Sequence, residues 1–413
     1  MLEEVRLRLA LWWRSRSAAV TAHLARRSYA RPPFSPAVGV IRVAAVQMRP
    51  RLLKDARQFA DHAYELAHTA VQQGAELVVF PDHVTLPLLR LVPGLSAALD
   101  DNVSLDEALV AIGEAASGDV ALGIADIMTV ATPAFRRLYG ATFSTLARRF
   151  GVHIAAGGTM LAERDGRVLS IAHLYGPNGR LVLHQAKTHL SPLERRWGLG
   201  VGEDIQVADT ALGRVALTGS MESAYFEPYR LLERGSTDLA LLSAAELGRP
   251  QPWRPLRGAW ARVQEARLYG IQGALVGEAF GLSFAGPAAI YAPLPLTPAR
   301  DGILAMAQGE EDEVVVADLD IGALRRLRAE RPSMRNEALI GHYLPLLYTR
   351  PWPWPEDATG EERRHPWAGA EAADADAEAA AALGTAADAA ARADLEEADE
   401  GDPARLPSQL TPT

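Results

Sequence analysis

The chain contains no cysteine among its 413 residues. This absence excludes disulfide bridges, thiolate metal sites and any thiol nucleophile. Long apolar runs are also absent, because no stretch reaches the roughly 18 uninterrupted apolar residues of a membrane span. Near the N-terminus, charged residues such as Glu4, Arg6 and Arg8 interrupt the apolar ones, unlike the layout of a signal peptide. We therefore expect a soluble cytoplasmic protein.

Positive charge is scarce in the C-terminal part of the chain. The whole chain carries a net charge of -9, and residues Pro355 to Thr413 hold about 15 acidic and about 4 basic residues, or roughly -11. The remainder is close to neutral and has no long basic stripe outside the N-terminal segment, so we expect no nucleic-acid partner. The tail is rich in alanine but has no apolar stripe to bury. We therefore predict that residues 351–413 form a disordered acidic tail.

The N-terminal segment has a different pattern. Leu2 to Arg27 are predicted to form one amphipathic helix with arginines on its polar side. Such a basic helix could contact a membrane surface. However, its apolar face is short and broken, so packing on the body of the protein or pairing of subunits is the favoured interpretation. A stiff connector with prolines from Pro32 to Pro36 follows, and we assign residues 1–40 to this segment.

From Ile41 the chain alternates short apolar runs with helical stretches. The predicted strands are Ile41–Gln47, Glu76–Phe80, His153–Ala156, Val168–Leu174, Val215–Thr218, Asp238–Leu242, Ala274–Val276 and Val314–Leu319. The predicted helices are Leu53–Gln73, Ala134–Phe150, Pro228–Arg234 and Trp253–Tyr269. Strands interleaved with helices indicate one large α/β domain over residues 41–350. Between His83 and Pro133 we expect an irregular, pocket-shaping insertion with a helix at Leu105–Ala116.

Three segments place polar side chains at the ends of predicted strands. The run GAELVVFPD ends in Asp82, the run KTHLSPLE extends from Lys187 to Glu194, and the run GRVALTGSME includes Ser220 and Glu222. Functional groups of α/β proteins gather at the carboxyl ends of strands. The three segments therefore predict a single polar site.

Taken in order, these segments resemble the nitrilase, or carbon–nitrogen hydrolase, superfamily from about Arg42 to Tyr348. The resemblance also rests on VAAVQ, Gly202-Glu203, Glu227 with Arg230, AAIYAP and VVVADLD. It implies an αββα sandwich whose members hydrolyse or form amides and nitriles with a Glu–Lys–Cys triad. It further implies a small amide-like ligand and a homodimer or larger homo-oligomer. No sequence pattern indicates a cofactor or a metal ion, and we predict neither.

Two of the three catalytic positions depart from the family pattern. Asp82 stands at the position of the base glutamate, and Ser220 stands at that of the cysteine nucleophile, whereas Lys187 matches. The predicted catalytic set is therefore Asp82, Lys187 and Ser220. Glu194 matches a second glutamate that assists catalysis in the family, and Met221 and Glu222 complete the predicted supporting residues. Outside the catalytic set, the sequence also has Ser170 where asparagine is frequent and Gly270 where glutamate is frequent.

The two departures weaken the chemistry of the family. A cysteine has a pKa of about 8.5 and readily yields thiolate, whereas a serine hydroxyl needs a well-matched base such as an oriented histidine. Asp82 is one methylene shorter than glutamate, and a shift of about 1 Å in a reacting group can cost about 100-fold in rate. His83 and His189 adjoin the site, but we favour structural roles for both, with His83 pointing away from Asp82. We expect weak or no hydrolysis and a retained ligand pocket.

Several alternatives remain open at this stage. The chain could be an active serine amidohydrolase in which Lys187 stabilises the oxyanion and Asp82 or Glu194 is the base. It could instead be an oligomeric scaffold that acts through its terminal extensions. The candidate residues also have structural interpretations: Lys187 and Asp82 could form only a buried ion pair, and Glu222 could orient loops. Glu194 could pair with Arg195 or Arg196.

Overall fold

The structure is a computed structural model that describes residues 15–29, 39–51, 53–93, 123–248 and 258–331, with a few isolated positions. It separates Met1–Ser333 from Met334–Thr413, and the fold described below belongs to the first unit. The predicted acidic tail and about half of the predicted insertion, including nearly all of the helix Leu105–Ala116, lie outside the described residues.

Most of the strands join one large sheet. Its order is β5-β4-β3-β2-β1-β10-β8-β7-β6, with β13 paired to β10, β14 paired to β13 and β15 antiparallel to β1. These strands are β1 Val40–Met48, β2 Leu77–Val79, β3 His153–Ala162, β4 Val168–Tyr175, β5 Leu181–Ala186, β6 Val207–Thr210, β7 Gly213–Gly219, β8 Leu239–Ala244, β10 Tyr269–Leu275, β13 Ala289–Tyr291, β14 Ile303–Met306 and β15 Glu313–Asp320. A small second sheet contains β9 Glu246–Leu247, β11 Gly277–Ala279 and β12 Leu282–Ala285.

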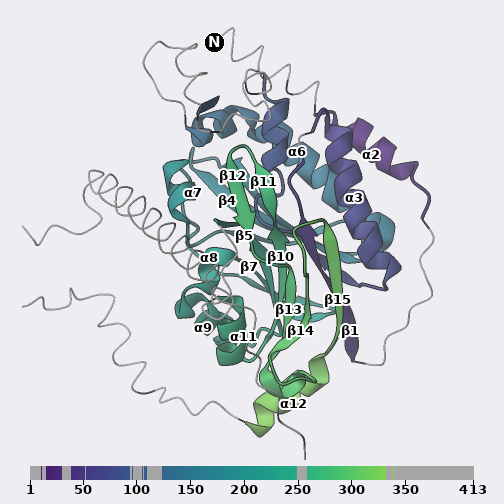
Figure 1. Ribbon diagram of the computed structural model, residues 1–413, viewed down its shortest axis with the longest axis vertical. Helices are drawn as coiled ribbons and strands as arrows, with labels where there is room; N and C mark the ends of the chain where they lie inside the picture. The colour runs from purple at the N-terminus through teal and green to yellow at the C-terminus, as the bar shows by residue number, and fades with distance from the viewer. Residues whose placement is uncertain are drawn as a thin grey trace, which may run out of the picture. The chain divides into compact units, whose positions relative to one another are not determined.

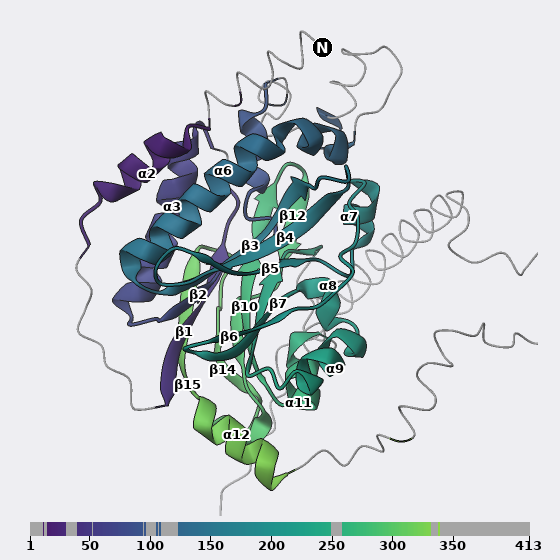
Figure 2. The same ribbon diagram turned by 180° about the vertical axis from the view of Figure 1, so that it is seen from behind.

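Helices cover both outer faces of the strand layers (Figures 1 and 2). On one side lie α2 Ser17–Ala25, α3 Ala56–Gln72 and α6 Ile124–Phe150, and on the other lie α9 Phe226–Arg234 and α11 Ala259–Ala266. The other helical elements are η1 Leu86–Leu91, α7 Pro192–Arg196, α8 Ser220–Ser223, η2 Leu294–Leu296 and α12 Ile321–Glu330. One hydrophobic core lies under α3 and α6, a second lies between the strand layers, and a third lies under α9 and α11. This arrangement is the αββα sandwich that the sequence predicts.

Strand β1 illustrates how the sequence specifies the layers. Val43 and Ala45 face the core between the strand layers, whereas Ala44 and Val46 face the core under the helices. Successive side chains of a strand point to opposite faces, so a strand with both faces covered needs a nearly continuous apolar run. The run VAAV meets this requirement, which explains why β1 lies within the sandwich.

The prediction of one helix from Leu2 to Arg27 is wrong. The backbone of Arg16 is extended, and α2 begins only at Ser17. Helix α2 packs on the body of the protein through the buried side chains of Val20 and Leu24. The carboxylate of Asp61 in α3 also accepts hydrogen bonds from His23 (2.8 Å) and from Arg27. The packing interpretation is therefore confirmed for α2. Among the described helices, none is long and apolar enough to cross a lipid bilayer.

Two other helices differ from their predicted bounds. Helix α6 begins ten residues before the predicted Ala134, because Gly123 caps it and Asp126 accepts the Gly123 N–H at 2.9 Å. The predicted irregular segment therefore ends before α6, and Pro133 lies inside the helix.

Helix α11 ends at Ala266 and not at the predicted Tyr269. The cause is the left-handed backbone of Arg267 (φ 49°), after which Tyr269 starts β10. Strand β10 thus begins before the predicted Ala274. A Cβ at Gly270 would lie 2.6 Å from the Val263 side chain of α11. The tight packing of α11 on β10 therefore explains why Gly270 cannot be the glutamate that is frequent in the family.

Candidate active site

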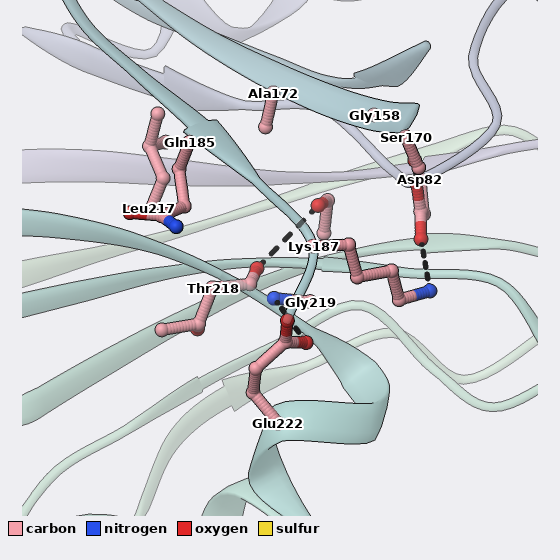
Figure 3. Close-up of a pocket in the computed structure, with 11 residues that line it drawn as sticks. Asp82, Gly158, Ser170, Ala172, Gln185, Lys187, Leu217, Thr218, Gly219 and Glu222 are labelled. Carbon is pink, nitrogen blue, oxygen red and sulfur yellow. Dashed lines mark hydrogen bonds and ion pairs between the residues drawn. The ribbon is translucent and has the colours of Figure 1, made fainter. Parts of the chain in front are cut away.

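The three predicted catalytic residues come from the ends of three strands. Asp82 lies three residues beyond β2, Lys187 immediately follows β5, and Ser220 immediately follows β7 as the first residue of α8. The structure brings two of them into direct contact, since Lys187 Nζ lies 2.8 Å from Asp82 Oδ2 (Figure 3). Both side chains are buried.

Glu194 joins this pair and completes a buried charge cluster. Its Oε1 accepts a hydrogen bond from Lys187 Nζ at 2.6 Å, and its Oε2 accepts the N–H of Ser191 at 2.7 Å. The second interaction belongs to the cap of α7, which fixes the position of the carboxylate. The alternative pairing of Glu194 with Arg195 or Arg196 is therefore wrong.

The cluster keeps its members charged. Burial lowers the pKa of Lys187, but the adjacent carboxylates of Asp82 and Glu194 outweigh this effect and raise it above its ordinary value. Burial raises the pKa of Glu194, but the hydrogen bond from His83 and the charge of Lys187 outweigh it and depress the pKa well below its usual range. At neutral pH the site therefore contains the charged ammonium of Lys187 beside the ionised carboxylate of Glu194.

Two glycines make room for the cluster. A Cβ at Gly158 in β3 would lie 1.8 Å from Asp82 Oδ1. A Cβ at Gly219, just before Ser220, would lie 2.9 Å from Lys187 Cε and 2.6 Å from Glu222 Oε2. Distances of this size exclude any larger residue unless the site moves. Neither glycine was among the predicted site residues, although the consecutive pair Gly157-Gly158 directly after the predicted strand His153–Ala156 was a usable signal.

Glu222 ties two of the converging segments together. Its Oε2 accepts the N–H of Gly219 at 3.1 Å, and its Oε1 accepts the N–H of Thr188 at 2.6 Å and the Thr188 hydroxyl at 3.1 Å. The carboxylate thus connects the end of β7 to the residue after Lys187. This geometry is that of a loop-orienting residue.

Ser220 differs from the charged members of the site. It is half-buried, and its carbonyl accepts a hydrogen bond from the Ser223 hydroxyl at 2.6 Å. Within the described ranges, no hydrogen bond joins the Ser220 Oγ to Asp82, to Lys187 or to any other group. Met221 follows Ser220 in the first turn of α8, where backbone N–H groups have no intrahelical acceptor.

The two histidines near the site do not contact Ser220 in the described structure. His83 has a left-handed backbone (φ 49°), so the chain turns after β2 and is not extended as the sequence analysis assumed. The His83 Nε2 consequently reaches Glu194 Oε1 at 3.0 Å. His189 stacks on the ring of Tyr225, with 4.6 Å between ring centroids.

A small polar cavity lies beside the cluster (Figure 3). Its polar lining includes Asp82, Ser170, Gln185, Lys187, Glu222 and Ser243. Its volume of about 10 Å³ is room for about one water molecule. Ser170 stands where asparagine is frequent in the family, and its hydroxyl donates to Asp82 Oδ1 at 3.4 Å.

One group of side chains in the described residues has the donor atoms for a metal ion. Asp82, His83 and Glu194 place their donor atoms within 4.8 Å of one another. However, the Lys187 ammonium already lies between the two carboxylates, at 2.8 and 2.6 Å. A dication would have to displace it, so the donor set does not fit a resident metal ion. We assign the positive charge of this site to Lys187.

Comparison with known proteins identifies the class to which this fold and site belong. The sequence model of the carbon–nitrogen hydrolase family matches residues 42–329. The chain therefore belongs to the carbon–nitrogen hydrolase family, and the resemblance drawn from the motifs is confirmed.

Individual relatives are distant. A probable hydrolase, YhcX, of Bacillus subtilis is 24% identical over 294 residues, which cover 70% of this chain and 51%, about half, of that protein. A nitrilase of Pyrococcus abyssi is 26% identical over 290 residues, covering 70% of this chain and 93% of that protein.

Among solved structures, a mutant amidase from Nesterenkonia sp. AN1 has a TM-score of 0.53 and 20% identity, covering 76% of this chain and all of that one. In that structure the acetamide moiety of fluoroacetamide is attached to the active-site cysteine. At this level of identity the likeness establishes the fold, which is the nitrilase αββα sandwich.

Proposed function

We propose that this chain binds a small amide-like ligand beside Lys187 and hydrolyses amides or nitriles weakly or not at all. In this proposal, Asp82, Lys187 and Ser220 occupy the positions of the family triad, with Glu194, Met221 and Glu222 in support. The family membership and the amidase and nitrilase relatives support an amide as the ligand class. The Lys187 ammonium is the donor that would hold the ligand's carbonyl oxygen, and the cavity beside it, which has room for about one water molecule, would have to widen to admit the rest of an amide.

One observation carries the proposal: the alcohol at the nucleophile position lacks a base. For hydrolysis, the Ser220 hydroxyl proton must pass to a base while Oγ bonds to the amide carbon. The carboxylate at the base position, Asp82, accepts hydrogen bonds from Lys187 (2.8 Å) and from the His83 backbone N–H (2.9 Å). No described hydrogen bond links it to Ser220. Both oxygens of this carboxylate thus already accept hydrogen bonds from groups other than Ser220.

The matching experiment restores the two missing groups. The variant Asp82→Glu/Ser220→Cys should gain measurable hydrolysis of a panel of small amides and nitriles, whereas the unaltered chain should remain near background. The matched control is the triple variant that also carries Lys187→Met, which should lose the gained rate because the ammonium is removed. Efficient turnover by the unaltered chain would overturn the proposal.

A serine amidohydrolase remains the second candidate, because Ser220 opens α8 at a strand end beside the cluster. Under this alternative, Ser220→Ala and Lys187→Ala would each abolish a rate that the unaltered chain displays. Thr69→Ser, at an exposed position of α3 that does not line the cavity, provides a conservative control for handling of the protein. If the unaltered chain has no rate above buffer, this alternative is rejected.

The family resemblance also motivates a proposed homo-oligomer. Three large apolar side chains at the start of α9 and within it are exposed: Tyr225 (44%), Phe226 (42%) and Leu231 (56%). Adjacent exposed apolar side chains are typical of contact surfaces. Light scattering should give at least twice the monomer mass, and Phe226→Glu/Leu231→Glu should reduce it. A monomeric unaltered chain would contradict the assembly.

We also propose that the protein is cytoplasmic, and cell fractionation tests this proposal.

A further inference from the structure

His83 is a buried, ionisable residue that the proposed ligand binding does not yet use. Its side chain is only 5% exposed, and its ring lies edge-on to Trp197 with 5.5 Å between centroids. Its left-handed backbone directs the imidazole towards Glu194 on the other side of the charge cluster. The imidazole is therefore connected to Lys187 through one shared carboxylate.

The sharing occurs at a single oxygen atom. Glu194 Oε1 accepts hydrogen bonds from both Lys187 Nζ (2.6 Å) and His83 Nε2 (3.0 Å). The ionised carboxylate can only accept, so Nε2 carries a proton in both charge states of the imidazole. The proton that comes and goes is the one on Nδ1, which is buried and has no hydrogen-bond partner.

We propose that His83 is a positioning residue that acts through Glu194: the protonated imidazole competes with Lys187 for Glu194 Oε1 and leaves the ammonium freer to bind the carbonyl oxygen of an amide. This inference rests on the proposed function. It adds to that function a dependence of ligand affinity on pH, set by a residue that does not touch the ligand.

The charges around His83 favour a proton on the ring. Burial lowers the pKa of His83, but Asp82 and the hydrogen-bonded Glu194 outweigh burial and the opposing charge of Lys187, so the pKa is raised above its usual value. Glu222 is the further carboxylate that acts on Lys187 from α8. A neutral amide should therefore bind more tightly as the pH falls through the pKa of His83, while Glu194 and Lys187 stay ionised.

The direct test is calorimetric titration with butyramide, a neutral amide, between about pH 6 and about pH 9, where an imidazole titrates. We expect the dissociation constant to decrease on the order of fivefold towards the lower pH, as is typical of coupled sites. His83→Gln can still donate to Glu194 but cannot be protonated, so its affinity should be independent of pH. His83→Asn, which tolerates a left-handed backbone, should be equally independent of pH if His83→Gln does not fold.

His189→Gln is the matched control, because this second half-buried histidine near the site stacks on Tyr225 and does not contact Glu194. It should retain the pH dependence of the unaltered chain. A constant affinity in the unaltered chain, or an unchanged pH dependence in either His83 variant, would overturn the inference.

A second measurement separates this inference from the proposed function. In NMR titrations without ligand, the Lys187 Nζ signal should shift with the same midpoint as the His83 ring, and this coupled shift should vanish in the His83 variant that folds. One outcome is that butyramide fails to bind at every pH tested while the Lys187 Nζ signal and the His83 ring signal still shift together. In that case the proposed function fails and the coupling through Glu194 stands. If the Lys187 signal does not follow the His83 ring, the inference is overturned whether or not butyramide binds.

Discussion

The two sides of the candidate site differ in how firmly their side chains are held. On one side, Asp82, Lys187 and Glu194 are buried and linked by charge-assisted hydrogen bonds of 2.6 to 2.8 Å. On the other side, Ser220 is half-buried, and its hydroxyl has no hydrogen bond among the described residues. The comparison separates recognition from reaction in the proposed function: the charged side is proposed to hold the ligand, whereas no described hydrogen bond gives the Ser220 hydroxyl a base.

The largest effect should follow from removing the shared cation. Lys187→Met leaves the two buried carboxylates of Asp82 and Glu194 with only the His83 imidazole beside Glu194 as a positive partner, and breaking a buried ion pair in this way costs about 3–5 kcal/mol. We expect the free energy of unfolding, measured by urea denaturation at neutral pH, to fall by about this amount. An unchanged midpoint would show that the charged side does not stabilise the fold.

The next effect should follow from adding a methyl group beside Asp82. In Gly158→Ala the new Cβ would lie 1.8 Å from Asp82 Oδ1, so the carboxylate or the strand must move. Overpacking of this kind costs about 1–3 kcal/mol, and the separation of Asp82 from Lys187 should also weaken amide binding. Gly166→Ala provides a control at a glycine with open space, although its positive φ adds local strain. Equal affinity in both variants would contradict the packing argument.

A smaller effect concerns pH. The folded pKa of Glu194 is depressed below its ordinary value of 4.5. The ionised Glu194 carboxylate therefore stabilises the fold fully at a pH above the pKa that Glu194 has in the unfolded chain. This stabilisation is lost as the pH falls through the lower pKa that Glu194 has in the folded chain. The unaltered chain should lose stability below about pH 4.5, and Glu194→Gln should show a shallower loss. Parallel stability curves for the two proteins would contradict the assigned charge state.

The smallest effect should come from the other side of the site. Ser220→Ala removes a hydroxyl that has no hydrogen-bond partner in the described structure, so the free energy of unfolding should change by less than about 0.5 kcal/mol. Thermal and urea unfolding would both report the change. A decrease of about 2 kcal/mol or more in the free energy of unfolding is the size expected when a buried hydrogen bond is removed. Such a decrease would indicate that the Ser220 hydroxyl makes hydrogen bonds beyond the described residues.

The sequence was sufficient for the layers because their signals are local or follow from a known family. The alternation of Val43, Ala44 and Ala45 between two cores is readable from the apolar run of β1. The bounds of α6 and α11 were missed because they depend on a glycine cap at Gly123 and on the left-handed backbone of Arg267. Both features are set by tertiary context more than by the hydrophobic pattern.

The candidate site was only partly predictable for a similar reason. Motif order placed Asp82 and Lys187 at strand ends in one polar site, but the link between His83 and Glu194 joins residues 111 positions apart. It also needs the left-handed turn at His83, which the assumption of an extended segment excluded. No sequence pattern indicates whether a serine hydroxyl has a hydrogen-bond partner, so the isolation of Ser220 required the structure.

Mass spectrometry of the unaltered chain during incubation with a simple amide tests the central claim most directly. An alcohol that attacks the carbonyl would form an ester, and the peptide that contains Ser220 would gain the mass of the acyl group. We predict that this peptide keeps its unmodified mass while the amide binds. Accumulation of acylated Ser220, together with release of ammonia, would contradict the account.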